Sequence, residues 1–523
     1  MKKRWRIVAD AWRRARAPVE RIAVDIEGDR IVRVHSAEDA AHSSEAVSFS
    51  SPALLIPAFH DSHTHLLTGG LTLDWVSLAG VEDVDEAAAR LEAAAKESDG
   101  RWLDGHDFSE ARLPLNRRAL DRIVPDIPVY IRSHDLHSAL VNSKTLAIAG
   151  LDDEAVDLPR GRFERDADGR LNGMLREHAC DLVLAFRPPL EKAQARKAIR
   201  RAQTLAFSFG ITAVGVSARS DLLPFYFDFI QSSEAKIRLN LWKVTPDFDF
   251  ATDCFERCND LQFRFATFKG FLDGALGSQT AALWEPYANN PNNMGILTAE
   301  EKELARFVET AAREDFQVAL HAIGDWACSM ALNAFEAAQA FESRMRLEHA
   351  QIMREEDIRR MADLGVIASM QPIHAISDMK WVEERIGKKR ARLSYAWRSI
   401  RDAGAHLCFG SDWPVETMSP FEGIYAAITR QDGNGNPPEG WIPEQRLTVE
   451  EALEAYTESG AYAARWEDDL GIIAEGKLAD LVVLSCNPFL CEPKELLKAE
   501  VLMTVCGGEV VHQRNGESVA SAN

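Results

Sequence analysis

The sequence has 523 residues, of which 46% are hydrophobic and 27% charged, as is ordinary for a globular enzyme. A single core seldom grows past about 250–300 residues unless it is a barrel, so we expect two structural units. The formal net charge of −21 repels phosphate backbones and anionic lipids. Nucleic acid and membrane surfaces are therefore excluded as expected partners.

Compartment signals favour a cytoplasmic protein. Residues Met1 to Arg16 are basic, but no apolar core of signal-peptide length follows them, and no apolar run is long enough to span a bilayer. The eight cysteines are scattered without a CxxC pair, as is typical of reduced structural thiols. Cys254 and Cys258 lie four residues apart, which favours a shared helix face over a metal site because no second pair accompanies them.

The N-terminal part of the chain predicts β structure. Alternating apolar segments at 22–26 and 31–34 flank Gly28-Asp29, which predicts a β-hairpin. The apolar run 53–56 then predicts a buried strand, which we take as the first strand of the main domain. This run leads into Asp61-Ser62-His63-Thr64-His65, so two histidines follow a buried strand.

His63 and His65 are spaced by two residues, the side-chain period of a strand, and should point the same way. Two neutral imidazoles converging at the end of a buried strand can hold one divalent cation, because the metal offsets the cost of their desolvation. A pair of hydrogen-bonded core histidines explains the same spacing equally well.

Strands alternating with amphipathic helices follow, which is the pattern of βα units and a parallel sheet. Together with 53–56 there are eight candidate strands, enough to close a barrel whose site lies at the carboxyl ends. The other seven are 211–216, 237–244, 264–272, 316–320, 345–347, 366–369 and 405–409. The interval 66–210 is too long for one crossover, so we expect an insertion with a helix at 85–96 and strands at 102–105 and 129–132. Insertions above the carboxyl face of a barrel usually shape the substrate pocket.

The C-terminal segments 481–484, 501–505 and 509–512 are again short and apolar, and Gly507-Gly508 separates the last two. They resemble the hairpin predicted near the N-terminus in length and composition. We therefore expect both ends of the chain to pair in one sheet, apart from the barrel.

Three further candidate strands end in a residue that can bind a metal, namely His321, His349 and Asp412. A histidine at one strand end is unremarkable. Its recurrence at successive strand ends is more specific, because a closed barrel brings those ends to a common axis.

Lys269 lies among Phe265, Phe268 and Phe271, where an unpaired ammonium group is costly to bury. Carboxylation of its amine by carbon dioxide would turn this side chain into an anionic oxygen ligand able to bridge two cations. A lysine whose stem packs while its charged head reaches water is the alternative.

Taken together, these segments resemble the amidohydrolase superfamily and, within it, the amidohydrolase-3 group that includes the N-substituted formamide deformylases. The resemblance runs nearly end to end. It is carried by Asp61-Ser62-His63-Thr64-His65, by KGFLDGALGSQT from Lys269 to Thr280, and by His321-Ala322-Ile323-Gly324-Asp325, Glu348-His349-Ala350, Gln371-Pro372-Ile373-His374, Phe409-Gly410-Ser411-Asp412 and Gly476-Lys477-Leu478-Ala479-Asp480-Leu481.

The family resemblance implies an α/β fold with a (β/α)8 TIM-like barrel. The barrel is expected over 57–466, with an inserted substrate-facing region at about 74–185. The same resemblance implies that 1–56 and 467–523 together form a small composite β-sandwich, which agrees with the strands predicted at both ends.

The resemblance also implies a binuclear metal centre with no ligand position missing. His63 and His65 would bind one metal and His321 and His349 the other, with carboxylated Lys269 as the bridge and Asp412 beside the nucleophile. We expect two divalent cations, zinc first, with manganese, iron or cobalt as alternatives. A hydroxide shared by the cations would attack an amide-type carbonyl, and Asp412 would carry the proton to the leaving nitrogen. The expected function is hydrolysis of a non-peptide carbon–nitrogen bond in a small molecule.

His137, His374 and Trp413 are predicted to line the pocket around these ligands and contact substrate. For His137, a loop histidine that forms hydrogen bonds with its own neighbourhood is an equal alternative. Asp325 and Glu348 are candidates for orienting the imidazoles from behind. The identity of the substrate cannot be read from the sequence, and a homo-oligomer is left open.

Two other hypotheses fit parts of the pattern. The first is a single-metal deaminase of the same superfamily, in which Lys269 is unmodified and His349 lies behind the ligands. Metal counting separates it from the binuclear hydrolase. The second is a metal-free relative kept for assembly or partner binding, which the complete ligand set disfavours because such relatives usually lose ligands.

Overall fold

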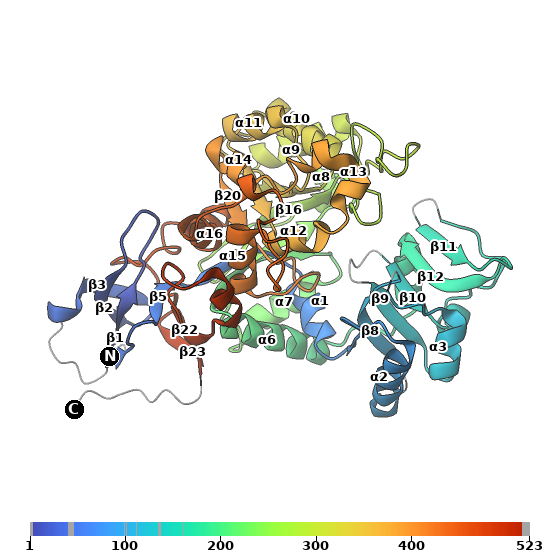
Figure 1. Cartoon of the computed structure of the whole chain (residues 1–523), viewed down its shortest axis with the longest axis horizontal. Coiled ribbons are helices and arrows are strands. Elements are labelled where there is room, and N and C mark those ends of the chain that lie inside the picture. The colour runs from blue at the N-terminus through green and yellow to red at the C-terminus, as the bar shows by residue number, and fades with distance from the viewer. Residues whose placement is uncertain are drawn as a thin grey trace. The chain divides into compact units, whose positions relative to one another are not determined.

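A computed structural model describes residues 4–514 except 40–45, 99, 101, 111, 134–137 and 159–160. The chain divides into two compact units, one formed by residues 1–66 with 202–523 and the other by residues 67–201 (Figure 1). The first unit contains a barrel sheet and a sheet built from both ends of the chain. None of the helices in the described ranges is both long and apolar enough to cross a membrane.

Eight parallel strands form the barrel sheet, in the order β20-β19-β18-β17-β16-β14-β13-β6. They are β6 (Phe59–Thr64), β13 (Ile211–Ala218), β14 (Arg238–Val244), β16 (Phe263–Phe271), β17 (Gln317–Ala322), β18 (Arg346–His349), β19 (Ile367–Met370) and β20 (Leu407–Phe409), with the short β15 (Cys258–Asn259) antiparallel to β16. An isolated parallel bridge between Thr64 and Trp413 brings the end of the sheet back to β6. The sheet is therefore a nearly closed barrel, and seven of the eight predicted barrel strands form where expected.

Amphipathic helices cover the barrel because their apolar residues recur on one side. In α9 (Glu301–Arg313) the buried residues are Leu304, Phe307, Val308 and Ala311, which is the spacing of one helix face. The other helices of this unit are α7 (Leu223–Ile230), α8 (Phe250–Asp253), α10 (Asp325–Ala337), α11 (Glu355–Asp363), α12 (Pro372–Asp378), α13 (Val382–Ala391), α14 (Trp397–Asp402), α15 (Pro420–Thr429), α16 (Val449–Tyr456) and α17 (Glu458–Ala463).

The prediction that 53–56 is a barrel strand is wrong. This run forms β5 (Leu54–Pro57), which pairs with β1 and β21 outside the barrel. The chain changes sheets at Ala58, whose N–H donates to Asp480 O, while the N–H of Phe59 donates to Gly210 O in front of β13. This change of sheet could not be predicted from the hydrophobic pattern, because β6 is fully buried although most of its residues are polar.

Strands from both ends of the chain form one sheet, in the order β23-β22-β21-β5-β1-β2-β3, with β4 beside β1 (Figure 1). They are β1 (Arg4–Ala11), β2 (Glu20–Glu27), β3 (Arg30–Ser36), β4 (Ala46–Ser48), β5, β21 (Leu481–Leu484), β22 (Val501–Cys506) and β23 (Glu509–Gln513). Buried residues of both ends, among them Ile7, Leu55 and Val483, share one core. The predicted pairing of the two ends is thus present, whereas its form as a sandwich stays a prediction.

The second unit has its own sheet, in the order β11-β12-β10-β9-β8-β7. Its strands are β7 (Val76–Ser77), β8 (Leu103–Phe108), β9 (Val129–Ser133), β10 (Ser138–Val141), β11 (Gly161–Arg165) and β12 (Leu171–Glu177). Its helices are α1 (Leu66–Thr72), α2 (Val84–Glu97), α3 (Arg117–Ile123), α4 (Ser143–Ile148), α5 (His178–Leu184) and most of α6 (Lys192–Ser208). The predicted domain boundaries, and a substrate-facing role for this unit, stay predictions.

Candidate metal centre

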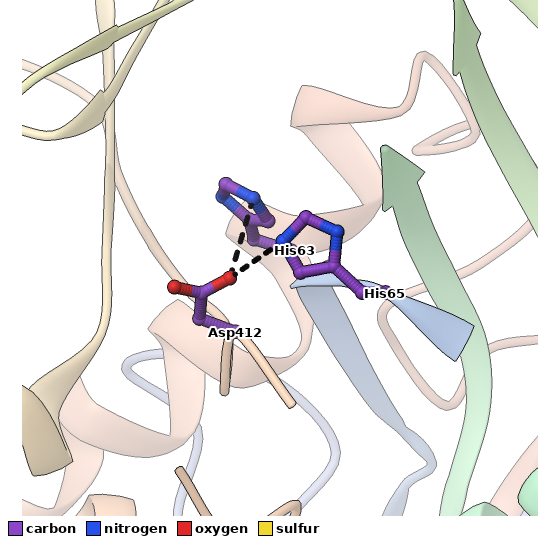
Figure 2. A group of neighbouring side chains, drawn as sticks. All are labelled: His63, His65 and Asp412. Atoms are coloured by element: carbon purple, nitrogen blue, oxygen red, sulfur yellow. Dashed lines mark ion pairs between the residues drawn. The ribbon is translucent and has the colours of Figure 1, made fainter. Parts of the chain in front are cut away.

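Three of the predicted ligands meet at the carboxyl end of the barrel. His63 and His65 come from the end of β6, and Asp412 comes from the segment after β20; Figure 2 shows both imidazoles turned toward one carboxylate oxygen. Asp412 Oδ1 lies 3.0 Å from His65 Nε2 and 3.6 Å from His63 Nε2. One ligand atom from each residue lies within 4.8 Å of the other two.

His321 and His349 extend this group from the carboxyl ends of β17 and β18. The ring centroids of His321 and His349 are 4.5 Å apart, and those of His349 and His63 are 5.1 Å apart. Burial, and then the neighbouring imidazoles, hold the pKa of His349 well below its usual value, so its ring is neutral and its lone pair is available. Within the described residues, His349 Nδ1 is buried without a hydrogen-bond partner.

The backbone at the centre is strained at two of these positions. His349 has φ +73° and Asp412 has φ +59°, in the left-handed region that costs a residue with a side chain about 1–3 kcal/mol. His349 is the last residue of β18, and Asp412 lies three residues after the end of β20. Such conformations cluster at functional sites, where surrounding contacts hold them in place.

Lys269 is fully buried on β16, and none of the described residues accepts a hydrogen bond from its Nζ. The ring centroid of Phe271 lies 5.2 Å from this atom. Burial lowers the pKa of Lys269 to about 8, against the opposing attraction of Glu348 and Asp412. A substantial fraction of the amine is therefore neutral near physiological pH. The alternative of a lysine whose head reaches water does not fit this burial.

Glu348 fixes the orientation of His63. Its Oε2 lies 2.6 Å from His63 Nδ1, which leaves Nε2 of the imidazole facing Asp412. Although burial opposes the charged form, Arg346 and His63 hold the pKa of Glu348 at about 2. This carboxylate is therefore ionised at neutral pH and favours the tautomer of His63 that carries its proton on Nδ1. The other candidate for this role, Asp325, accepts a hydrogen bond from the N–H of Trp284.

Arg346 supports this arrangement, although this role was not predicted from the sequence. Its Nε donates to Glu348 Oε1 at 2.8 Å, and its Nη2 donates to Ser62 O and Ser369 Oγ. The guanidinium lies over the ring of Trp242, 4.4 Å from the centroid. Arg346 therefore ties β6, β14, β18 and β19 together behind the imidazoles. Its position two residues before Glu348 on one strand was the available signal.

Asp61 closes the barrel beneath the histidines and was likewise not predicted as a functional residue. Its carboxylate accepts hydrogen bonds from the N–H and hydroxyl of Ser411 and from the N–H of His63. The N–H of Asp412 donates to His63 O at 2.7 Å. These bonds fix the segment that carries Asp412 against the end of β6.

Two of the three residues predicted to contact substrate, His374 and Trp413, lie within the described residues. His374 Nε2 lies 3.6 Å from Asp412 Oδ2, so its side chain faces the centre. Trp413 is buried, and its carbonyl accepts a hydrogen bond from the N–H of His65. His137 lies outside the described residues. Contact of these residues with substrate stays a prediction.

The donor set fits a divalent cation. Neutral imidazole nitrogens and an ionised carboxylate are the ligands that zinc, iron and cobalt accept in proteins. Although burial disfavours its charge, the imidazoles of His63, His65 and His349 hold the pKa of Asp412 well below its usual range. A cation at this point would bind ligand atoms of His63, His65 and Asp412, which the fold already holds within 4.8 Å of one another.

Comparisons with known proteins agree with this chemistry. A family model described as the amidohydrolase family matches residues 53–512. The putative amidohydrolase YtcJ of Bacillus subtilis (strain 168) is 32% identical over 489 residues, which cover 90% of this chain and 91% of that protein. The N-substituted formamide deformylase of Arthrobacter pascens is 27% identical over 526 residues, covering 94% and 95%. An uncharacterised metal-dependent hydrolase from Pyrococcus horikoshii OT3 has a TM-score of 0.78 at 26% identity, covering 94% of this chain and 99% of that one.

Proposed function

The chain belongs to the amidohydrolase family, and we propose that it hydrolyses an amide-type carbon–nitrogen bond, other than a peptide bond, in a small molecule. The observation that carries this proposal is the group of His63, His65 and Asp412 at the carboxyl end of the barrel, with ligand atoms within 4.8 Å of one another. The relative from Arthrobacter pascens, an N-substituted formamide deformylase, is named for a bond of this class.

The cofactor in this proposal is a pair of divalent cations, with zinc first. His63 and His65 would hold one, His321 and His349 the other, and Lys269 would bridge them after its neutral amine adds to carbon dioxide and loses a proton. When bound, such cations acidify water and polarise a carbonyl oxygen. Support comes from the burial of Lys269 and the unpartnered Nδ1 of His349 in the described part of the chain.

Asp412 is the proton carrier of the proposed reaction. Its low pKa keeps the carboxylate ionised at neutral pH, so Oδ1 can accept a proton from the attacking water and deliver it to the leaving nitrogen. Glu348 holds His63 in one tautomer throughout, because its Oε2 stays bonded to Nδ1. His374, 3.6 Å from Asp412 Oδ2, is placed to orient a polar group of the substrate beside the same carboxylate.

A substrate screen coupled to metal analysis tests the proposal. The protein is assayed for amine release from N-substituted formamides, N-acyl amino acids and cyclic ureas, with metal content measured on the same preparation. We expect at least one class to be hydrolysed, activity to disappear with a chelator, and zinc to restore it. A metal-loaded, folded protein that releases amine from none of these classes would count against the proposal.

A single-metal deaminase is the second candidate, and one observation favours it. Among the described residues, the group of close ligand atoms consists of His63, His65 and Asp412, which is enough for one cation. Near one metal per chain, with ammonia released from a heterocyclic amine, would support this candidate. Near two metals per chain would support the binuclear hydrolase. A protein that purifies without metal and lacks both activities would favour the metal-free binding hypothesis.

A further inference from the structure

Four arginines gather at the amino-terminal end of the barrel. Arg264 is the second residue of β16, Arg344 lies two residues before β18, Arg257 precedes β15, and Arg465 follows α17. The amino ends of parallel strands lie at the opposite end of a barrel from their carboxyl ends. This arginine cluster is therefore separate from the candidate metal centre.

The cluster has fewer carboxylates than arginines. Asp315 pairs with Arg257 and, at 3.2 Å, with Arg465. Glu467 pairs with Arg344 at 2.5 Å. In the described ranges these two carboxylates make the ion pairs of the cluster, and Arg264 forms no ion pair with a carboxylate within 4 Å. Direct ion pairs thus leave an excess of positive charge here, which Asp468, another acidic neighbour of Arg344, reduces in part.

Arg264 is more buried than the other three arginines and is only 4% exposed. Its Nη1 donates to Asn259 Oδ1 at 2.5 Å, which is a neutral acceptor. Its Nε, like that of Arg465, is buried with no acceptor among the residues the structure describes. Burial, and then the charges of Arg465, Arg344 and Arg257 against that of Asp315, lower the pKa of Arg264 to about 10. A guanidinium in this position is costly unless an anion accompanies it.

We propose that this arginine cluster binds a phosphate group, with Arg264 at its base and Arg257, Arg344 and Arg465 at its rim. The side chains at the rim are between 23% and 36% exposed, so a solute can approach them. Nη1 and Nη2 of Arg344 and of Arg465 already donate to protein oxygens. The donors left for the oxygens of phosphate include the Nε groups of Arg264 and Arg465, which have no acceptor among the described residues. A doubly charged oxyanion balances the excess charge that Asp315 and Glu467 leave.

Thermal unfolding in the presence of phosphate tests the site. Inorganic phosphate and the phosphate monoester glycerol phosphate are titrated separately into the full chain at constant ionic strength, with sodium chloride replaced in step. We expect a saturable rise in Tm for the wild type that is lost, or needs at least about tenfold more ligand, in Arg264→Gln. Arg398→Gln, which removes an arginine from a separate ion pair with Glu451, should keep the rise.

Every outcome of this titration either supports or contradicts the proposed phosphate site. A saturable rise with either compound that depends on Arg264 supports the site, and the more effective compound identifies whether the source is free phosphate or an ester. The proposal is wrong if neither compound gives a saturable rise, or if the rise persists unchanged in Arg264→Gln, as it would for phosphate at the metal centre. If Arg264→Gln does not fold, Arg465→Gln at the rim takes its place in the same comparison. The readout needs no activity, so the result stands whether or not the proposed hydrolysis is found.

Discussion

Asp412 is the residue on which the proposed chemistry depends, because three imidazoles surround its carboxylate. Oδ1 lies 3.0 Å from His65 Nε2 and 3.6 Å from His63 Nε2, and Oδ2 lies 3.6 Å from His374 Nε2. We predict that Asp412→Asn lowers kcat by about 10²–10⁴-fold, since the amide cannot accept and return a proton. Steady-state kinetics on the substrate found by screening measures this loss.

The control for that variant is His374→Asn, which also changes the surroundings of the carboxylate. It should raise KM more than it lowers kcat if His374 orients substrate. Metal content and Tm of Asp412→Asn should stay near those of the wild type. Turnover at the wild-type rate in Asp412→Asn would remove Asp412 from the mechanism.

Glu348→Gln tests the support of His63 from behind. The amide cannot reproduce the charge-assisted bond to His63 Nδ1, and it leaves Arg346 without its buried carboxylate. We predict a loss of metal affinity of about 10–100-fold, measured by competition with a chromogenic chelator. Asp325→Asn is the matched control, because Asp325 is also a buried carboxylate but accepts from the N–H of Trp284, and this variant should keep its metal affinity. Equal losses in both variants would show a general effect of removing buried charge.

Whether a residue of the centre could be predicted from the sequence depends on whether its role follows from its own type and position or from contacts with distant residues. The histidines and Asp412 could be predicted because each follows a candidate strand and is a metal-binding type. Glu348 could be suggested only because it precedes His349. Arg346 and Asp61 could not be assigned, because their roles consist of contacts with Ser62, Ser369 and Ser411, far away in the sequence.

At the scale of elements, seven barrel strands were predictable because each is an apolar run between amphipathic helices. The eighth was not, because β6 is a buried strand made largely of polar residues. Its polar side chains are satisfied by other strands, as when Thr64 Oγ1 donates to Gly215 O. The strands β10, β11 and β12 of the second unit were also missed, although each pairs with its neighbours in one sheet.

Gly215 on β13 packs closely against β6. A Cβ at this position would lie 2.4 Å from Ser62 O and 2.6 Å from Trp242 Cζ2. We predict that Gly215→Ala destabilises the fold by about 1–3 kcal/mol through overpacking and also weakens metal binding, because β6 carries His63. Urea unfolding and metal titration measure the two effects.

The matched control for that substitution is Gly277→Ala. The nearest neighbours of a Cβ there are atoms of Trp381 at 3.8 Å or more, so the methyl group has room. This variant should keep its stability. A Gly215→Ala protein as stable as Gly277→Ala would show that the strands separate without cost.

The start of α16 predicts a pH dependence. Glu451 closes a capping box with Thr448 and pairs with Arg398 at 2.5 Å. Although burial opposes its charge, Arg398 and Thr448 lower the pKa of Glu451 from 4.5 to about 2. A carboxyl whose pKa is lower in the folded state stabilises that state above pH 4.5, and this contribution is lost as the pH falls toward 2. Wild type should therefore exceed Glu451→Gln in Tm by a constant margin above pH 5, and the margin should shrink below pH 4.5. A margin that does not change between pH 7 and pH 3 would contradict this assignment.

For the molecule as a whole, a buried ion pair helps to join the sheet made from both ends of the chain to the barrel. Arg238 at the start of β14 donates from Nε and Nη2 to the two carboxylate oxygens of Asp480, at 2.9 and 2.8 Å. Asp480 precedes β21 and also accepts a hydrogen bond from the N–H of Gly507. Segments 242 residues apart in the sequence are thereby fixed to each other.

Removing one partner of this pair should be far more costly than removing both. We predict that Asp480→Asn lowers the free energy of unfolding by about 3–5 kcal/mol, because it leaves the Arg238 guanidinium buried without its countercharge. The double variant Arg238→Met/Asp480→Leu replaces the pair by apolar side chains and should recover most of that loss. Urea unfolding of the wild type, Arg238→Met, Asp480→Leu and the double variant gives the coupling energy between the two positions. Additive losses would show that Asp480 acts on the terminal sheet through Gly507 rather than on the barrel through Arg238.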